Sequence, residues 1–116
     1  MARQVLAIDL KDDAAVEVYR EHHRRVWPEV LASLHNFGVL DMQIYLVGRR
    51  LVMIVDVEEG CDLRAAFDAR VASHPRVGEW ETLMTSLQQR VPGSKPGEWW
   101  AAMEPVFDLR ETARPS

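Results

Sequence analysis

A tyrosine, a histidine and a tryptophan recur at four-residue intervals in the stretch Y-R-E-H-H-R-R-V-W-P, which runs from Tyr19 to Pro28. Because a helix turns by about 100° per residue, Tyr19, His23 and Trp27 would share one stripe roughly 80° wide. An imidazole exchanges protons near neutral pH, and the flanking rings offer apolar walls with a hydroxyl and an indole N–H. The spacing therefore indicates acid/base chemistry on this helix face, with His23 as the candidate proton carrier.

Each member of this stripe also has a purely structural interpretation. His23 could be a core histidine whose ring nitrogens are satisfied by neighbours, and Tyr19 could serve only to hold that imidazole. Trp27, next to Pro28, suits a packing anchor at a bend in the helix. Spacing alone leaves both interpretations open.

A second group of candidates follows later in the chain. Trp80 falls on the apolar side of its expected helix, where an aromatic ring is usually core, although an indole face also stacks on the C–H groups of a sugar. Glu81 is either solvated or the second polar group of a pocket. Trp99 and Trp100 suggest a lid or an interface, because two exposed tryptophans are unusual on a monomer.

Metal and nucleotide chemistry find little support. His35 and His74 have no cysteine or carboxylate at metal-ligand spacing, and the adjacent His22 and His23 point in different directions on a helix. The P-loop, dinucleotide-binding, zinc-protease and nucleophile-elbow motifs are absent from the sequence. We therefore expect no metal site and no bound nucleotide.

Length and composition suit one compact domain. The chain has 116 residues, of which 47% are hydrophobic and 28% charged, as in ordinary globular proteins. Its 14 Lys and Arg residues are scattered among 18 Asp and Glu residues, so no basic stripe is available to bind nucleic acid. The start lacks the apolar segment of a signal peptide, and no run approaches the ~20 residues of a membrane span. We expect a cytoplasmic protein without membrane contact.

Hydrophobic periodicity predicts the elements that position the candidate residues. Residues 4–10 form an apolar run and are expected to be a strand, followed by a helix that Asp12 or Asp13 caps. Pro28 should make this helix kink or restart before it stops at Gly38. The apolar face of the helix comprises Val16, Tyr19, His23, Val26, Val30 and Leu34.

Two strands and a turn follow. Residues 39–47 alternate apolar and polar side chains, with Leu40, Met42, Ile44 and Leu46 on one face. Gly48-Arg49 suits a two-residue turn, and 51–57 is an almost unbroken apolar run, so a β-hairpin is predicted. A strand that is apolar on both faces must be covered twice. One helical layer covers a single face, so the other face calls for a second subunit or a second sheet.

The remaining elements complete an α+β fold. Residues 62–73 and 77–90 are expected to be helices, 91–98 a loop, and 103–109 a last strand. The order β-α-β-β-α-α-β resembles the ferredoxin-like arrangement, in which helices cover one face of an antiparallel sheet. One domain is expected over residues 1–110, with a frayed C-terminal tail over 111–116.

Four segments of the chain resemble the L-rhamnose mutarotase family. They read Y-x-x-x-H-x-x-x-W-P-E from Tyr19, I-Y-L from Ile44, W-x-x-x-M-T from Trp80 and V-F-x-L from Val106. The likeness extends from about residue 3 to about residue 109. It implies a homodimer of ferredoxin-like subunits whose sheets form a dimeric α/β barrel, with His23 as the general acid/base and Tyr19 as a substrate contact.

Two positions depart from the family pattern. Met42 stands where the family has a tyrosine, and Glu81 stands where it has a second tryptophan directly after Trp80. The pocket loses a hydroxyl and gains a carboxylate, so its preferred sugar should carry a different hydroxyl pattern from that of L-rhamnose. L-Fucose is the alternative substrate. Met42, Trp80 and Glu81 are expected to line the sugar site beside Tyr19.

The implied activity is mutarotation, in which a pyranose opens to its aldehyde and closes on the other face of the carbonyl. One group must protonate the ring oxygen while another takes the proton of the anomeric hydroxyl. An imidazole suits one role because its unperturbed pKa is about 6.5. The second proton carrier is not assigned, and Glu81 is a candidate. No metal or organic cofactor is expected.

Two other functional classes remain open. The dimeric α/β barrel also serves cofactor-independent monooxygenases, which would bind an aromatic substrate and consume oxygen. A non-catalytic sugar-binding module would use the same aromatic pocket without speeding anomer exchange.

Overall fold

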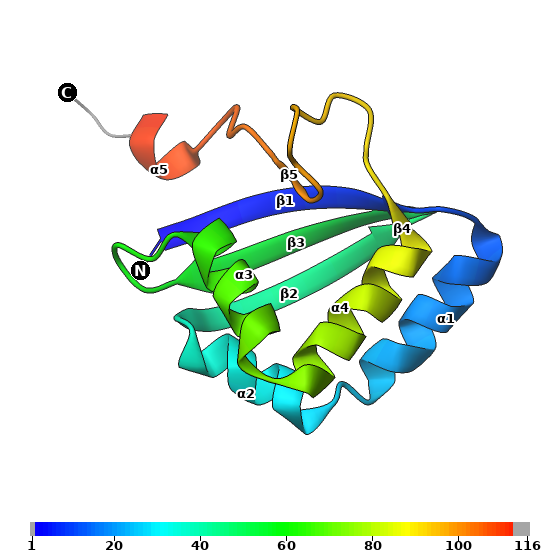
Figure 1. Ribbon diagram of the computed structural model, residues 1–116. Coiled ribbons are helices and arrows are strands. Elements are labelled where there is room, and N and C mark those ends of the chain that lie inside the picture. Colours follow the sequence, from blue (N-terminus) through cyan, green and yellow to red (C-terminus); the bar gives the residue numbers. More distant parts are fainter. Residues whose placement is uncertain (1, 113–116) are drawn as a thin grey trace.

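An antiparallel sheet carries the helices α1 to α4 on one of its faces (Figure 1). The computed structural model describes residues 2–112, so the end of the tail expected over 111–116 lies outside the described residues. The strand order is β2-β3-β1-β4, with β5 also paired to β1, which confirms the ferredoxin-like arrangement. The elements are β1 (Ala2–Leu10), α1 (Asp13–Arg24), α2 (Pro28–Asn36), β2 (Val39–Val47), β3 (Arg50–Val57), α3 (Leu63–Ser73), α4 (Pro75–Leu87), β4 (Gln88–Gln89), β5 (Ala101–Ala102) and α5 (Leu109–Thr112).

Capping residues divide the helical segments where the sequence predicts. The side chain of Asp12 accepts a hydrogen bond from the backbone N–H of Ala15 at 2.8 Å and so begins α1. The predicted restart at Pro28 is confirmed, because α1 ends at Arg24 and Pro28 is the first residue of α2. This break turns the chain directly after the histidine pair.

The β2–β3 hairpin contains one irregularity that the alternating sequence does not reveal. Gly48 adopts a φ of +59° at the turn, a conformation that suits glycine. A β-bulge lies between Val39 and Asp41, so Leu40 is 47% exposed and does not share the inner face with Met42. The expected placement of Leu40 on that face is therefore wrong.

The C-terminal strand is much shorter than the sequence predicts. The strand expected over 103–109 is wrong: β5 comprises Ala101 and Ala102, and only the N–H of Met103 extends the pairing, to the carbonyl of Val5 at 2.8 Å. The hydrophobic pattern misleads here because its apolar side chains are exposed, Val106 to 94% and Phe107 to 70%. The last helix of the main body likewise covers 75–87 instead of 77–90, since the chain straightens at Gln88 and pairs with β1.

The core fills the space between the sheet and its helices. One cluster joins α1 and α4 to the sheet, and a second lies between β3 and the start of α3. Their fully buried members include Ile8, Leu10, Leu51, Val55 and Val57. Within residues 2–112, no helix is both long and apolar enough to cross a membrane. In the part of the chain that the structure describes, the opposite face of the sheet carries no helix (Figure 1).

Candidate active site

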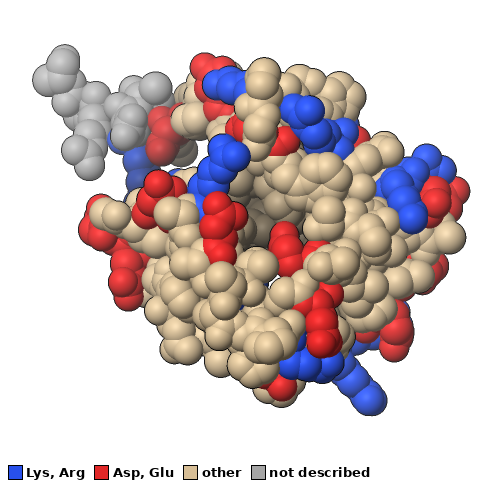
Figure 2. All heavy atoms as spheres, in the orientation of Figure 1, with Lys and Arg blue, Asp and Glu red and all other residues tan. Residues whose placement is uncertain are grey.

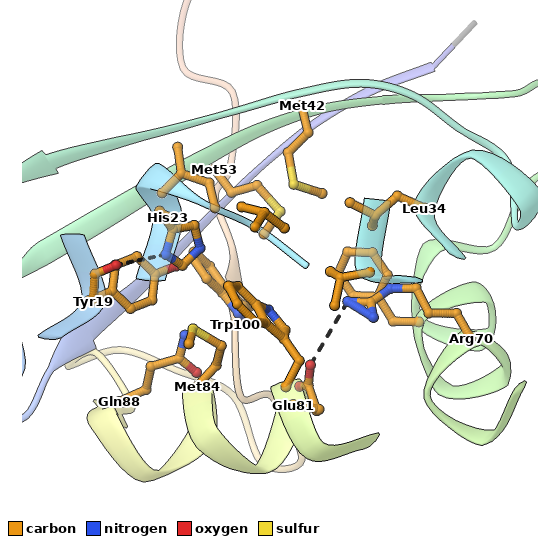
Figure 3. A pocket seen from close by; sticks show the side chains of 15 residues that line it. Tyr19, His23, Leu34, Met42, Met53, Arg70, Glu81, Met84, Gln88 and Trp100 are labelled. Carbon is orange, nitrogen blue, oxygen red and sulfur yellow. Dashed lines mark hydrogen bonds and ion pairs between the residues drawn. The ribbon is translucent and has the colours of Figure 1, made fainter. Parts of the chain in front are cut away.

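The backbone of α1 fixes the imidazole of His23. Nδ1 of His23 lies 2.9 Å from the carbonyl oxygen of Tyr19, one turn earlier. Because a carbonyl only accepts, Nδ1 must carry the hydrogen, and the neutral ring then has its lone pair on Nε2. Figure 3 shows Nδ1 turned to that carbonyl, while the rest of the ring faces the cavity. The local helix geometry therefore prepares Nε2 to accept a proton.

Aromatic rings surround this imidazole. The ring of Tyr19 stacks on that of His23 with centroids 4.1 Å apart and an interplanar angle of 22°. The ring of Trp80 packs edge to face against the ring of His23, with centroids 5.3 Å apart. It packs in the same way against the ring of Trp27, with centroids 5.2 Å apart. The guanidinium of Arg76 lies 3.8 Å from the centroid of Trp27, which anchors that ring from the outside. The histidine is thus held from several sides.

Burial sets the protonation of the two polar groups on this face. Burial lowers the pKa of His23, with a smaller lowering by His22, against the raising effect of the Tyr19 carbonyl. Burial also raises the pKa of the Tyr19 hydroxyl well above its usual range, and the nearby carboxylate of Glu81 adds to that effect. At neutral pH the imidazole is accordingly neutral and the phenol protonated, which makes one a base and the other a hydrogen-bond donor.

The side chain of Gln88 contacts the loop before β5. The indole N–H of Trp99 donates to Oε1 of Gln88 at 2.9 Å, so the amide NH₂ is the remaining donor of that side chain. Gln88 lowers the pKa of Tyr19 by hydrogen bonding, as a donor to the phenol oxygen would.

A cavity of about 120 Å³ adjoins the imidazole. It is smaller than the roughly 300 Å³ or more of pockets for drug-sized molecules, and its size suits a ligand below that class. Figure 2 shows that the molecular surface is hollowed near its centre in this orientation. The lining residues are Tyr19, His23, Val26, Val30, Leu34, Met42, Ile44, Met53, Phe67, Arg70, Trp80, Glu81, Met84, Gln88 and Trp100.

All five residues that the sequence marks for the site line this one cavity. Tyr19 and His23 come from α1, Met42 from β2, and Trp80 and Glu81 from α4. Figure 3 shows these elements converging on the cavity from the helix layer and the sheet. Their convergence is the arrangement that a binding site requires, and their individual roles remain predictions.

Of the other lining residues, three carry hydrogen-bonding side chains and were not assigned to the site from the sequence. Trp100 was expected, with Trp99, to be an exposed lid or interface residue, but both are half-buried, and Trp100 forms part of the cavity wall. Gln88 carries no motif. Arg70 could have been found, because it lies seven residues after Leu63 and three after Phe67, on the buried face of the helix.

The state of the imidazole gives a prediction for titration. In NMR spectra of the ¹⁵N-labelled protein, we expect His23 to titrate with a midpoint below about 6.5 and to carry its hydrogen on Nδ1 at neutral pH. The direction follows because burial disfavours the charged ring. The spectrum of a His23→Gln variant assigns the signal. A midpoint above the free-histidine value would contradict this burial.

Comparison with known proteins identifies clear relatives. The family model described as L-rhamnose mutarotase matches residues 3–109. An L-fucose mutarotase from Xanthomonas campestris is 45% identical over 114 residues, which cover 96% of this chain and 90% of the relative. An L-rhamnose mutarotase from Paraburkholderia phymatum is 27% identical, with 93% of this chain and 91% of the relative covered.

Solved structures share the fold. The L-rhamnose mutarotase FA22100 from Formosa agariphila superposes with a TM-score of 0.65 at 22% identity, covering 93% of this chain and 98% of its own. Tetracenomycin F2 cyclase from Streptomyces glaucescens superposes with a TM-score of 0.59 at 13% identity, covering 93% of this chain and 96% of its own. At these identities the likeness establishes the architecture alone.

Proposed function

The chain belongs to the L-rhamnose mutarotase family, and we propose that it is an isomerase that interconverts the α and β anomers of a deoxyhexose pyranose. The observation that carries this proposal is the neutral imidazole of His23 beside a cavity whose lining includes the motif residues of the family. Neither the monooxygenase nor the sugar-binding alternative has a comparable observation in its favour. Cytoplasmic action stays a prediction.

We infer that L-fucose is a better substrate than L-rhamnose. The L-fucose mutarotase relative is 45% identical to this chain, whereas the L-rhamnose mutarotase from Paraburkholderia phymatum is 27% identical. The two sugars differ in the configuration of their hydroxyls. Met42 and Glu81, which depart from the family pattern, both line the cavity, and this supports a preference for a hydroxyl pattern other than that of L-rhamnose. Polar wall groups decide such preferences because an unpaired buried hydroxyl or carboxylate is costly.

The proposed reaction transfers one proton between two oxygens on the same carbon. Nε2 of His23 takes the proton of the anomeric hydroxyl while the bond from C1 to the ring oxygen breaks, which leaves an aldehyde. The resulting imidazolium gives that proton to the ring oxygen. After rotation about C1–C2, the same steps run in reverse on the other face of the carbonyl, so protons and electron pairs balance without a second carrier.

The surrounding residues would position the sugar for this transfer. The protonated hydroxyl of Tyr19 donates a hydrogen bond beside the imidazole, and Trp80 and Met42 supply apolar walls for the C–H faces of the ring. Glu81 lies on the wall with Arg70, and Figure 3 draws that pair across the cavity from His23. The position of Glu81, across the cavity from His23, favours a role in binding a sugar hydroxyl over a role in proton transfer at C1.

Polarimetry tests this function directly. Freshly dissolved crystalline α-L-fucose should approach its equilibrium rotation faster as protein is added, with an initial rate proportional to protein concentration. The same protein should act less well on L-rhamnose. If neither sugar mutarotates faster than in buffer, the proposed function is wrong. If L-rhamnose is the faster substrate, the proposed function stands and the proposed sugar preference is wrong.

We infer that the open face of the sheet forms a homodimer. Its centre is apolar and half-buried or exposed, and an ion pair stands at each end, between Arg3 and Asp56 at 2.8 Å and between Arg50 and Asp9 at 2.8 Å. The apolar side chains on this face include Val5, Tyr45, Val52 and Ile54. Exposed apolar surface of this kind is typical of an interface.

A charge at the centre of this face should separate the subunits. We expect the wild-type protein to be a dimer at micromolar concentration by light scattering, and Ile54→Lys to be a monomer, because two buried ammonium groups would oppose each other. Thr82→Lys adds the same charge to an exposed position of α4 and should remain dimeric. A monomeric wild-type protein would contradict the paired-sheet arrangement.

A further inference from the structure

Arg70 is a buried cation with too few partners. Arg70 is 6% exposed and lines the cavity from α3. Neither Nε nor Nη1 has a hydrogen-bond partner, although both are buried. Buried guanidinium N–H groups without acceptors cost several kcal/mol, roughly the penalty of an unpaired buried charge. A ligand in the cavity would supply the missing acceptors.

Glu81 is the only ion-pair partner of Arg70 among the described residues, and the contact is loose. Nη2 of Arg70 lies 3.9 Å from Oε2 of Glu81, which is beyond hydrogen-bond distance. Phe67 packs under the guanidinium with its centroid 5.1 Å away and restricts its movement. The pair therefore presents fixed donors next to an acceptor, with a gap between them.

This pair and His23 stand on different sides of the cavity. Figure 3 shows the imidazole on the side of α1 and the guanidinium and carboxylate on the side of α3 and α4. In a pyranose, C4 lies across the ring from C1. A sugar whose anomeric carbon reaches Nε2 of His23 would therefore direct its C3 and C4 hydroxyls toward Arg70 and Glu81.

We propose that Arg70 and Glu81 together bind the adjacent C3 and C4 hydroxyls of the sugar and so determine which deoxyhexose the enzyme accepts. The inference rests on the proposed function and deepens it. Each hydroxyl oxygen accepts a hydrogen bond from the guanidinium, and a hydroxyl hydrogen is donated to the carboxylate of Glu81. Arg70 thereby gains the acceptors that it lacks in the free protein.

The chemistry of the pair favours a neutral diol over an anionic ligand. A carboxylate or phosphate would satisfy Arg70 but would face the negative charge of Glu81 on the same wall. A diol satisfies both groups, because every hydroxyl both donates and accepts. The configuration at C4 decides where that hydroxyl points, and this is a position at which L-fucose and L-rhamnose differ.

Removal of the 4-hydroxyl from the sugar should lower kcat/KM much less once Arg70 has been removed, because both changes break the same interaction. In the wild-type protein, we expect 4-deoxy-L-fucose to show a kcat/KM for anomer exchange about 10- to 100-fold below that of L-fucose, the effect of one or two charge-assisted hydrogen bonds. In Arg70→Met the same comparison should give less than about a threefold difference, since the partner of the hydroxyl is gone. Equal losses in both proteins would overturn the proposal.

A second variant separates recognition from charge neutralisation. Arg70→Lys keeps the positive charge beside Glu81 but replaces the planar guanidinium fork, whose donors are spaced to reach two adjacent hydroxyls, with donors on a single nitrogen. We expect it to discriminate between L-fucose and the 4-deoxy sugar nearly as poorly as Arg70→Met. If lysine restores full discrimination, Arg70 serves only as a counter-ion. Arg49→Met removes an exposed ion pair to Asp13 far from the cavity and should match the wild type.

A non-reacting ligand makes the test independent of catalysis. 1,5-Anhydro-L-fucitol keeps the C3 and C4 hydroxyls but has no anomeric hydroxyl, so it binds without ring opening. NMR shift titration should show it binding about tenfold or more weakly to Arg70→Met than to wild type, although the urea midpoint of the variant should be no lower than that of the wild type. Such a loss supports the proposal even if the protein fails to mutarotate L-fucose. Unchanged binding overturns it even if mutarotation is fast.

Discussion

Replacement of His23 by glutamine is expected to lower the rate of enzymatic anomer exchange about 10²- to 10⁴-fold, the usual contribution of a general acid/base. Glutamine retains a polar side chain of similar size but cannot accept and release a proton near neutral pH. Because sugar contacts elsewhere in the cavity remain, the loss should fall on kcat more than on KM. Initial rates by polarimetry over a range of L-fucose concentrations separate the two constants.

The neighbouring histidine provides a matched control. Nδ1 of His22 lies 2.8 Å from the carbonyl of Val18, the same contact one residue earlier, and its ring also meets Trp80, at 6.2 Å. His22 does not line the cavity. His22→Gln should therefore keep nearly full activity. Equal losses in the two variants would show that the substitutions act through the helix and not through a reacting imidazole.

Truncation of Trp80 to alanine is expected to lower the free energy of unfolding by about 3–5 kcal/mol, the range for large aromatic side chains in cores. Trp80 is 5% exposed and meets the rings of His23 and Trp27 edge to face. A stability loss of this size is a large part of the ~5–15 kcal/mol of an ordinary domain. Urea denaturation followed by circular dichroism measures it.

Phenylalanine at the same position should recover much of that stability. Trp80→Phe keeps an aromatic wall beside His23 and leaves a smaller void than alanine does. Its unfolding free energy should lie between those of wild type and Trp80→Ala. A loss below about 1 kcal/mol in Trp80→Ala would mean that the indole is not part of the core.

The sequence predicts the elements whose signals are local. Asp12 as a cap, Pro28 as a helix start and the glycine turn after β2 each act through nearby backbone atoms, and the structure has all three in place. The stripe of Tyr19 and His23 on the cavity face follows from the helical repeat alone. Such features depend on few residues and are not altered by distant packing.

Features that depend on distant contacts escape this kind of reasoning. The segment after β5 has an apolar pattern typical of a strand, but after Met103 none of the described strands pairs with it. Trp100 reaches the cavity only because its loop lies against the sheet and helices. Arg70 looks like an ordinary surface charge until its helix face is known, and the missing hydrogen-bond partners of its Nε and Nη1 are visible only in three dimensions.

The proposed mechanism is tested most directly at chemical equilibrium, by saturation transfer between the two anomeric protons of L-fucose. With wild-type protein, transfer should rise in proportion to protein concentration and persist at neutral pH, where the ring of His23 is uncharged. With His23→Gln at the same concentration, transfer should return close to the rate in buffer. If the wild-type protein fails to increase transfer, or if both proteins increase it equally, His23 does not carry the proton.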